Sequence, residues 1–300
     1  MNRFRLRGTG VALVTPFKNG KVDFDALENV IEHCIRGGVE FLVSLGTTGE
    51  AITLNPKECR EVLDFTIKIN AGRLPLVVGF FGDNDTARLT EKIAHFDFTG
   101  FDALMSSSPS YNKPSQEGIF QHYMKVAEVS PLPIIIYNVP SRTASNVTAA
   151  TILRLAHASE KFLAVKEAAG DMVQAMQIIK NKPEHFQLLS GDDPLTLPLI
   201  SCGAEGVISV IGNAFPHTFS SMVRAALDED FVAARQLNDI LLDVHPWLYV
   251  DGNPSGVKAA MEILGLCSKE VRLPLAPATD KTISELKIEI EKVLVAQTVN

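Results

Sequence analysis

The sequence lacks the residue spacings that most metal and disulfide sites require. Its four cysteines, Cys34, Cys59, Cys202 and Cys267, lie far apart and form no CxxC pair. We therefore expect buried free thiols rather than disulfides or a zinc site. The seven histidines show no HxH or HExxH spacing, so the sequence predicts no metal centre.

Three further absences narrow the class of protein. No basic patch accompanies the formal net charge of −7, which argues against a nucleic-acid or anionic-membrane partner. No apolar run of signal-peptide length follows the N-terminus, and no apolar segment reaches transmembrane length, so a cytoplasmic enzyme is the default expectation. No low-complexity tract interrupts the 300 residues, of which 46% are hydrophobic, and a large folded core is therefore available.

The sequence does contain a repeated unit, a short apolar run followed by a longer amphipathic segment. The apolar runs lie at 11–14, 41–44, 76–78, 103–105, 134–137, 163–166, 187–190 and 206–210. The amphipathic segments lie at 24–35, from 55 onward, and at 85–96, 115–129, 148–156, 172–180, 194–202 and 216–227. Asn55, Pro56 and Glu58 form the signature of a capped helix start. The alternation predicts strands joined by helices.

Eight such units before residue 230 predict an α/β fold, a parallel sheet closed into a (β/α)8 TIM barrel. A doubly wound open sheet is the alternative, but its first strand is usually followed by a GxGxxG motif, and here Thr15-Pro16-Phe17 follows. Helical patterns at 231–244, 256–264 and 282–296 predict a C-terminal all-helical appendage. We expect two domains, a catalytic barrel over 1–230 and a helical domain over 231–300.

The apolar run at 162–165 ends in Lys166, at a predicted strand end, where barrel enzymes place their catalytic groups. A desolvated lysine has a lowered pKa, and its neutral amine can attack a carbonyl. The alternative is a lysine that reaches solvent or pairs with Glu167. Because neighbours on a strand point to opposite faces, we expect Lys166 to face the barrel interior and Glu167 the helices.

The Gly-Thr-Thr-Gly turn at 46–49 follows the second predicted strand. Its backbone N–H groups and the hydroxyls of Thr47 and Thr48 can hold a carboxylate or a phosphate. A plain glycine turn is the alternative. If the barrel forms, this turn lies on the same rim as Lys166.

Three larger polar side chains also lie at or after predicted strand ends. Tyr137 can be a site hydroxyl or a core aromatic, and Tyr111 a site hydroxyl or a turn aromatic. Arg142 can clamp a carboxylate or form a surface ion pair. Hydroxyls, one arginine and one lysine on a single rim suit an anionic keto acid.

Four motifs are highly specific in combination: Gly-Thr-Thr-Gly-Glu at 46–50, Tyr-Asn-Val-Pro-Ser-Arg-Thr at 137–143, Val-Lys-Glu-Ala at 165–168 and Ser-Gly-Asp-Asp at 190–193. A further stretch, Gly-Val-Ala-Leu-Val-Thr-Pro-Phe at 10–17, precedes them. On these motifs the chain resembles the dihydrodipicolinate synthase family, within the pyruvate-dependent class I aldolase superfamily. The resemblance covers essentially the whole chain.

The resemblance implies a carbon–carbon lyase of the class I aldolase type, acting in lysine and diaminopimelate biosynthesis. Lys166 would form an imine with pyruvate, and the derived enamine would add to the aldehyde of L-aspartate 4-semialdehyde. No cofactor is implied beyond this covalent imine. Thr48, Tyr137 and Tyr111 match the proton relay, with Tyr111 donated across a subunit interface of a homotetramer built from tight dimers. Imine formation needs such proton transfers.

The resemblance also implies the substrate contacts. Thr47 and Thr48 match the site of the pyruvate carboxylate, and Gly191 and Ile208 match further pocket positions. Arg142 matches the residue that holds the carboxylate of the second substrate.

Several positions depart from the family pattern. Ala144 stands where glycine is usual, so we expect a changed loop, and Phe80 and Phe81 are expected to crowd the rim. Of the effector positions of lysine-inhibited relatives, only Asn84 matches. The other four read Pro56, Cys59, Arg88 and Ser110. We therefore predict weak or absent feedback inhibition by lysine.

Two other functions stay open. A sialic acid lyase (N-acetylneuraminate lyase) or a 2-keto-3-deoxy-sugar-acid aldolase would share Lys166 and Tyr137, but it would need hydroxyl-binding groups in place of Arg142. A barrel that only binds or regulates is the second alternative. The intact set of candidate catalytic side chains argues against it.

Overall fold

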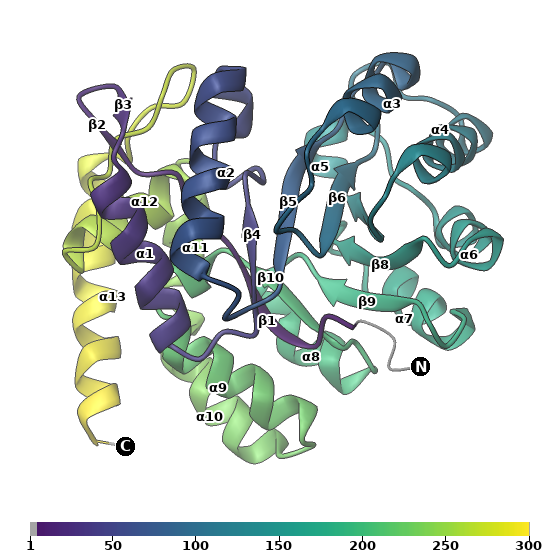
Figure 1. The fold of residues 1–300 in the computed structure, drawn as a ribbon. Helices are drawn as coiled ribbons and strands as arrows, with labels where there is room; N and C mark the ends of the chain where they lie inside the picture. The colour runs from purple at the N-terminus through teal and green to yellow at the C-terminus, as the bar shows by residue number, and fades with distance from the viewer. Residues whose placement is uncertain (1–4, 300) are drawn as a thin grey trace.

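The chain folds into the predicted closed barrel, seen from the side in Figure 1. The computed structural model describes residues 5–299, apart from the side chains of Phe80, Thr298 and Val299. Eight parallel strands pair in the order β1-β10-β9-β8-β7-β6-β5-β4 and back to β1. They are β1 (Gly8–Ala12), β4 (Phe41–Ser44), β5 (Leu76–Phe81), β6 (Ala103–Ser107), β7 (Ile134–Asn138), β8 (Phe162–Glu167), β9 (Gln187–Ser190) and β10 (Gly206–Ser209).

Helices follow the strands and cover the outside of the barrel (Figure 1). The longer ones are α1 (Phe24–Arg36), α2 (Pro56–Asn70), α3 (Thr86–His95), α4 (Gln116–Val129), α6 (Ala149–Ala158), α7 (Met172–Asn181), α8 (Thr196–Ser201) and α9 (Pro216–Leu227). Short helical turns stand after four strands, namely η1 (Ala51–Thr53), α5 (Pro140–Thr143), η2 (Asp193–Leu195) and η3 (Ile211–Asn213). The capping box predicted at the start of α2 is confirmed, because Asn55 and Glu58 each bond the other's backbone N–H at 2.9 Å.

The predicted C-terminal helical appendage is also confirmed. It comprises α10 (Phe231–Leu242), α11 (His245–Tyr249), α12 (Ser255–Ile263) and α13 (Asp280–Val299). Helix α10 packs against α9 of the barrel, and α13 packs against α12 and α10. The expected domain boundary at residues 230 and 231 stays a prediction.

Two local features differ from the sequence predictions. Strand β1 begins and ends earlier than the predicted run at 11–14, because the N–H of Val14 donates to the side chain of Asn213 instead of a neighbouring strand. A small antiparallel hairpin, β2 (Phe17–Lys18) and β3 (Lys21–Val22), was not predicted. Its Asn19-Gly20 turn has positive φ at both residues, which is typical of tight hairpins.

The barrel has two apolar layers. Alternate strand residues such as Val43, Ile135 and Leu189 fill its interior, while Leu42, Ile136 and Leu188 face the surrounding helices. Within residues 5–299, no helix combines the length and the apolarity that crossing a bilayer requires.

The expectation that Phe81 crowds the rim is wrong. Phe81 is 1% exposed, and its ring lies 5.3 Å from the ring of Phe96 and 5.4 Å from that of Phe98, in the layer outside β5. Alternation along the strand turns this side chain outward. The side chain of Phe80 lies outside the described part of the structure, so its effect on the pocket stays a prediction.

The four cysteines are free, but only two of them are buried as predicted. Cys34 and Cys59 lie in the core, whereas Cys202 and Cys267 are only half-buried. The described residues contain no cluster of three or more potential metal ligands from His, Cys, Asp or Glu.

Candidate active site

A cavity of about 230 Å³ opens where the strands end. It lies at the C-terminal rim of the barrel, the face on which barrel enzymes carry their active sites. Its lining residues are Thr48, Tyr137, Val139, Ser141, Arg142, Lys166, Ala168, Gly191, Asp192, Pro194, Val210, Tyr249 and Asn253. The cavity thus brings together five of the residues predicted for the site: Thr48, Tyr137, Arg142, Lys166 and Gly191.

Lys166 and Tyr137 are direct neighbours in the barrel. They are register partners on β8 and β7, and the Nζ of Lys166 lies 4.5 Å from the centroid of the Tyr137 ring. Lys166 is only 5% exposed, yet no residue within 5–299 gives its amine a hydrogen bond or an ion pair. An amine that faces a cavity and has no partner in the described chain is well placed to attack an electrophile.

Glu167 points away from this cavity, as predicted. Its carboxylate accepts hydrogen bonds from Asn138 at 2.9 Å and from Gln174 of α7 at 3.0 Å. Burial raises the pKa of Glu167, although these hydrogen bonds oppose the shift. The two neighbours therefore serve opposite faces of β8, and Glu167 is not the ion-pair partner of Lys166.

Gly191 leaves the space that the lysine side chain occupies. A Cβ atom at this position would lie 3.1 Å from the Cγ of Lys166 and 2.7 Å from the Cβ of Ala168. Any larger residue would therefore push against the side chain of Lys166 or of Ala168. Glycine here is a steric requirement of the site.

The hydroxyl of Thr48 is held by a residue from the C-terminal appendage. Its Oγ1 accepts a hydrogen bond from Nδ2 of Asn253 at 3.0 Å, and Thr48 is 2% exposed. Among the described residues, no hydrogen bond joins Thr48 to Tyr137. Both side chains nevertheless line the same cavity.

Three predicted site residues do not line this cavity. Thr47 is half-buried in the turn after β4, and Ile208 is 1% exposed inside the barrel. Tyr111 is 89% exposed, at a backbone φ of 64°. A side chain this exposed cannot serve the cavity of its own chain from its present position.

Arg142 lines the cavity from helix α5, which follows β7. Its guanidinium forms no ion pair within the described chain. Ala144 ends this helix at a φ of 58°, in the left-handed conformation that glycine adopts more easily. The alanine therefore keeps a glycine-like turn at a cost in backbone strain, rather than extending the helix.

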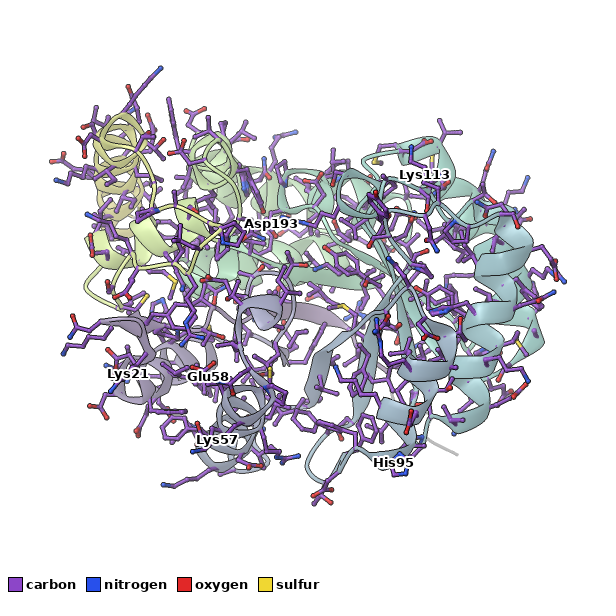
Figure 2. All side chains as sticks on the ribbon, turned by 90° about the horizontal axis from the view of Figure 1, so that it is seen from above. Lys21, Lys57, Glu58, His95, Lys113 and Asp193 are labelled. Carbon is purple, nitrogen blue, oxygen red and sulfur yellow. The ribbon has the colours of Figure 1, made fainter. Side chains whose placement is uncertain are left out.

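Tyr249 lines the cavity and donates a hydrogen bond to Asp193 outside it, and neither residue was predicted for the site. The Oδ2 of Asp193 accepts hydrogen bonds from the N–H groups of Val210 and Ile211 and, at 3.0 Å, from the Tyr249 hydroxyl. Burial of this hydroxyl and the nearby Asp193 raise the pKa of Tyr249 well above its usual value, so the phenol stays neutral. Figure 2 shows Asp193 in the middle of the molecule.

Some signal for these residues was present in the sequence. Asp193 belongs to the Ser-Gly-Asp-Asp motif at a strand end, which marks it as a candidate. Tyr249 and Asn253 stand in a helical segment far from any strand end, and no local pattern distinguishes them. Only the packing of the appendage over the rim reveals their position.

The matches to known proteins agree with this geometry. Residues 5–293 match the model of the family described as the Dihydrodipicolinate synthetase family. This chain belongs to that family. The match covers the barrel and most of the appendage, so the family includes the segment that carries Tyr249 and Asn253.

Named relatives and solved structures of the family cover nearly the whole chain. The 4-hydroxy-tetrahydrodipicolinate synthase of Flavobacterium psychrophilum is 49% identical over 282 residues, which are 94% of this chain and 96% of the relative. A crystal structure of dihydrodipicolinate synthase from Aquifex aeolicus is 40% identical, with a TM-score of 0.91, over 96% of this chain and 98% of that one. A monomeric dihydrodipicolinate synthase variant is 34% identical, with a TM-score of 0.93, over 96% of both chains.

These matches confirm the predicted family, barrel fold and class of enzyme. The relatives carry the name of the activity expected from the sequence motifs. The roles of the individual site residues stay predictions, which the geometry above makes specific.

Proposed function

We propose that this chain acts as a 4-hydroxy-tetrahydrodipicolinate synthase, condensing pyruvate with L-aspartate 4-semialdehyde. The observation that carries the proposal is Lys166, buried and without a protein partner in the described chain, at the wall of the rim cavity. A lysine in such a place is suited to attack a ketone. Family membership gives the reaction in which that imine is used.

The reaction begins with attack of the Lys166 amine on the ketone carbon of pyruvate. Loss of water gives an iminium ion, and loss of a proton from the pyruvate methyl group gives an enamine. The enamine carbon forms a bond with the aldehyde carbon of the semialdehyde, whose oxygen takes up a proton. The amino group of the second substrate then attacks the imine carbon, and the ring closes as Lys166 leaves. No cofactor takes part in these steps.

Hydroxyl groups in the cavity move the protons. Thr48 and Tyr137 both line the cavity that Lys166 faces. Water leaves the carbinolamine only after protonation, and a hydroxyl can donate that proton and recover it later. The N–H groups around Thr47 and Thr48 hold the pyruvate carboxylate, and Gly191 shapes the pocket, whereas Ile208 packs inside the barrel and does not line the cavity.

Arg142 binds the carboxylate of the second substrate. It lies on the same cavity wall as Lys166 and has no ion-pair partner among residues 5–299. A free guanidinium at the mouth of a pocket can take a carboxylate in two parallel hydrogen bonds. This feature favours the semialdehyde over a sugar as second substrate, because a sugar would need hydroxyl-binding groups at this position.

Tyr111 completes the relay in a second copy of the chain. Its 89% exposed side chain is a poor surface residue for a monomer but a suitable group to insert into a partner's site. A tight dimer would exchange these tyrosines, and two dimers would form the homotetramer. The assembly is expected in the cytoplasm, and its regulation by lysine is expected to be weak or absent. Half-inhibition at submillimolar lysine would contradict that last expectation.

The deciding experiment is to trap the imine. The protein is incubated with pyruvate and borohydride, and its mass is compared for wild type, Lys166→Ala and the control Lys180→Ala, which changes an exposed lysine on α7. We expect one reduced pyruvate adduct in wild type and in the control, and none in Lys166→Ala. An adduct that persists in Lys166→Ala, or none in wild type, would refute the mechanism.

The second arm of the experiment separates the alternative functions. Aspartate semialdehyde and N-acetylneuraminate are offered as competing substrates to the pyruvate-loaded or free enzyme. Turnover of the semialdehyde alone supports the synthase. Cleavage of the sugar acid would favour a lyase of the same superfamily, and trapping without turnover of either would favour a non-catalytic role.

A further inference from the structure

Asn253 connects the C-terminal appendage to the rim of the barrel. It lies between α11 and α12 and is separated from Thr48 by 205 positions in the sequence, yet its Nδ2 donates to Thr48 Oγ1 at 3.0 Å. Asn253 also lines the cavity that holds Lys166. The amide thus contacts a relay hydroxyl directly, from outside the strand ends.

This contact decides where the proton of the Thr48 hydroxyl can point. A hydroxyl carries one proton and two lone pairs. Since Asn253 donates to one lone pair, the Thr48 proton cannot lie along that line. It remains available for donation to another acceptor, such as a substrate in the cavity.

The orientation of the amide follows from the groups around it. The Oδ1 of Asn253 is buried and has no hydrogen-bond partner within the described chain. Turning the amide over would put this oxygen on Thr48 and leave the NH2 group, with two donors, unsatisfied in its place. At most one N–H of the amide lacks a partner in the present orientation, whereas both would lack one after the turn, and a buried N–H without a partner is tolerated less well than a carbonyl oxygen.

Contacts on both sides hold the Asn253 segment in place. Before it, Asp251 accepts hydrogen bonds from the N–H of Thr279 at 2.8 Å and from the Thr279 hydroxyl at 3.0 Å. After it, the Ser255 hydroxyl donates to the carbonyl of Ala276 at 2.7 Å. The amide is therefore presented to Thr48 by an anchored chain.

A buried ion pair ties the same segment to the turn that carries Thr48. Nζ of Lys258 lies 2.5 Å from Oε1 of Glu50, and both side chains are fully buried. Glu50 is two residues beyond Thr48, and Lys258 is five residues beyond Asn253. The ion pair therefore connects the segment of Asn253 to the turn of Thr48 close to the hydrogen bond between these two residues.

We propose that Asn253 is a positioning residue that orients the Thr48 hydroxyl for proton donation to the reacting substrate. The inference rests on the proposed imine chemistry. Asn253 itself transfers no proton. It fixes one lone pair of the Thr48 oxygen, so that the hydroxyl proton is directed into the cavity in every turnover.

The test is a double-mutant cycle on the rate of imine formation. Asn253→Ala is made in wild type and in Thr48→Val, and trapping of the pyruvate imine by borohydride is followed over time at saturating pyruvate. We expect Asn253→Ala to slow imine formation about 10- to 100-fold in wild type and to cause no further loss in Thr48→Val. Equal losses in both backgrounds, or no loss in wild type, would refute the proposal.

A matched control separates positioning from loosening of the segment. Ser255→Ala removes a hydrogen bond from the same segment without touching the cavity. We expect it to slow imine formation far less than Asn253→Ala does, because the contacts of Asp251 and Lys258 still anchor the segment. A slowing equal to that of Asn253→Ala would mean that the segment matters only as structure, and the proposal would fail.

A second variant covers the case in which Asn253→Ala does not fold. Asn253→Asp keeps the size, but an ionised carboxylate only accepts, so it draws the Thr48 proton away from the cavity. We expect its rate at saturating pyruvate to fall at neutral pH and to recover relative to wild type as the pH falls and the carboxyl becomes a donor. If the ratio of the Asn253→Asp rate to the wild-type rate did not change with pH, the proposal would be contradicted.

The outcomes also separate this inference from the proposed function. If wild type forms no adduct at Lys166, the proposed function fails. If wild type forms the adduct and the Asn253 variants form it at the same rate, only the positioning role fails.

Discussion

Two buried lysines in this chain show how environment separates a structural amine from a reactive one. Lys258 is fully buried, and its Nζ contacts the Glu50 carboxylate at 2.5 Å and the carbonyl of Glu270 at 2.9 Å. Lys166 is 5% exposed, and none of the described residues supplies its amine with a carboxylate or a carbonyl. Aromatic rings lie near both, Phe17 at 4.2 Å from Lys258 and Tyr137 at 4.5 Å from Lys166.

The difference lies in which group satisfies the amine. Lys258 has its partners within the protein, so its interactions are complete in the folded chain and hold the appendage against the barrel. Lys166 faces a cavity, where a bound substrate would have to supply the interaction partner of its amine. Unsatisfied buried groups cost stability, and natural proteins keep them mainly where function needs them.

Replacing Lys166 by methionine tests most directly whether its amine is reactive rather than structural. We expect Lys166→Met to lose activity by a factor on the order of 10⁴ or more, because no other group can form the imine. The free energy of unfolding should stay the same or rise by about 1 kcal/mol, since a buried unpaired amine is exchanged for an apolar chain of similar length. Steady-state assays and urea unfolding measure the two effects. A large loss of stability would show that Lys166 has a structural role.

The same substitution at the other lysine should have the opposite result. Lys258→Met leaves the Glu50 carboxylate buried without its ion-pair partner and, among the described residues, with only the N–H of Arg272 as a hydrogen-bond donor, which is expected to lower the free energy of unfolding by about 3–5 kcal/mol. Adding Glu50→Gln should recover about 1–3 kcal/mol of that loss, because the uncompensated charge is removed. Urea unfolding measures both variants. If the losses of unfolding free energy caused by Lys258→Met and Glu50→Gln are additive, the ion pair is not the interaction that holds the appendage against the barrel.

Arg142 extends the comparison to a third cation, also unpaired and at the cavity. Arg142→Ala should raise the KM for aspartate semialdehyde about 10- to 100-fold, the loss of a charged hydrogen bond of about 1.5–3 kcal/mol. The rate of imine trapping with pyruvate should not change. Arg88→Ala is the control, because Arg88 is paired with Asp83 outside the cavity. A slower pyruvate step in Arg142→Ala would place the guanidinium on the first substrate.

The smallest expected effect concerns a paired group at the edge of the appendage. The Arg272 guanidinium, together with the N–H of Asn55, lowers the pKa of Glu58 from 4.5 to about 2. Because the folded-state pKa is below the unfolded one, this stability is present above pH 4.5 and is lost as the pH falls from 4.5 towards 2. The two side chains are 22% and 18% exposed, so we expect only about 1 kcal/mol.

Unfolding measured across this pH range tests the Glu58 prediction. Glu58→Gln should flatten the fall in stability between pH 4.5 and 2. Glu61→Gln, on the same helix and in an exposed ion pair with Lys57 of 3.7 Å, should leave it unchanged. Equal pH curves for Glu58→Gln and wild type would show that Arg272 does not stabilise the carboxylate.

The barrel rim could be predicted from the sequence because the patterns that indicate its strands and helices are short. The periodicity of apolar residues indicates each strand and helix within about 20 residues, and closure of a parallel barrel brings the C-terminal ends of all strands to one face. Lys166, Tyr137, Thr48, Gly191 and Arg142 line one cavity for this reason. The orientation of Glu167 also followed from strand alternation alone.

Other features could not be read in this way. Phe81 was placed on the rim although alternation turns it outward, and Ile208 lies in the barrel interior rather than at the cavity wall. Tyr111 is predicted to serve a second chain, and a single sequence contains no pattern that pairs two surfaces. The hairpin at Asn19-Gly20 had a readable turn signal that was not used.

By itself the sequence determined the alternation of strands and helices, the closure of the barrel and a lysine at the end of β8. Only the tertiary structure decided that Asn253 reaches Thr48 across 205 positions and that Lys258 reaches Glu50 across 208. The physical reason is the distance along the chain over which each kind of interaction acts. Periodicity and caps act over one or two turns of chain, whereas these contacts depend on how the whole appendage packs over the rim.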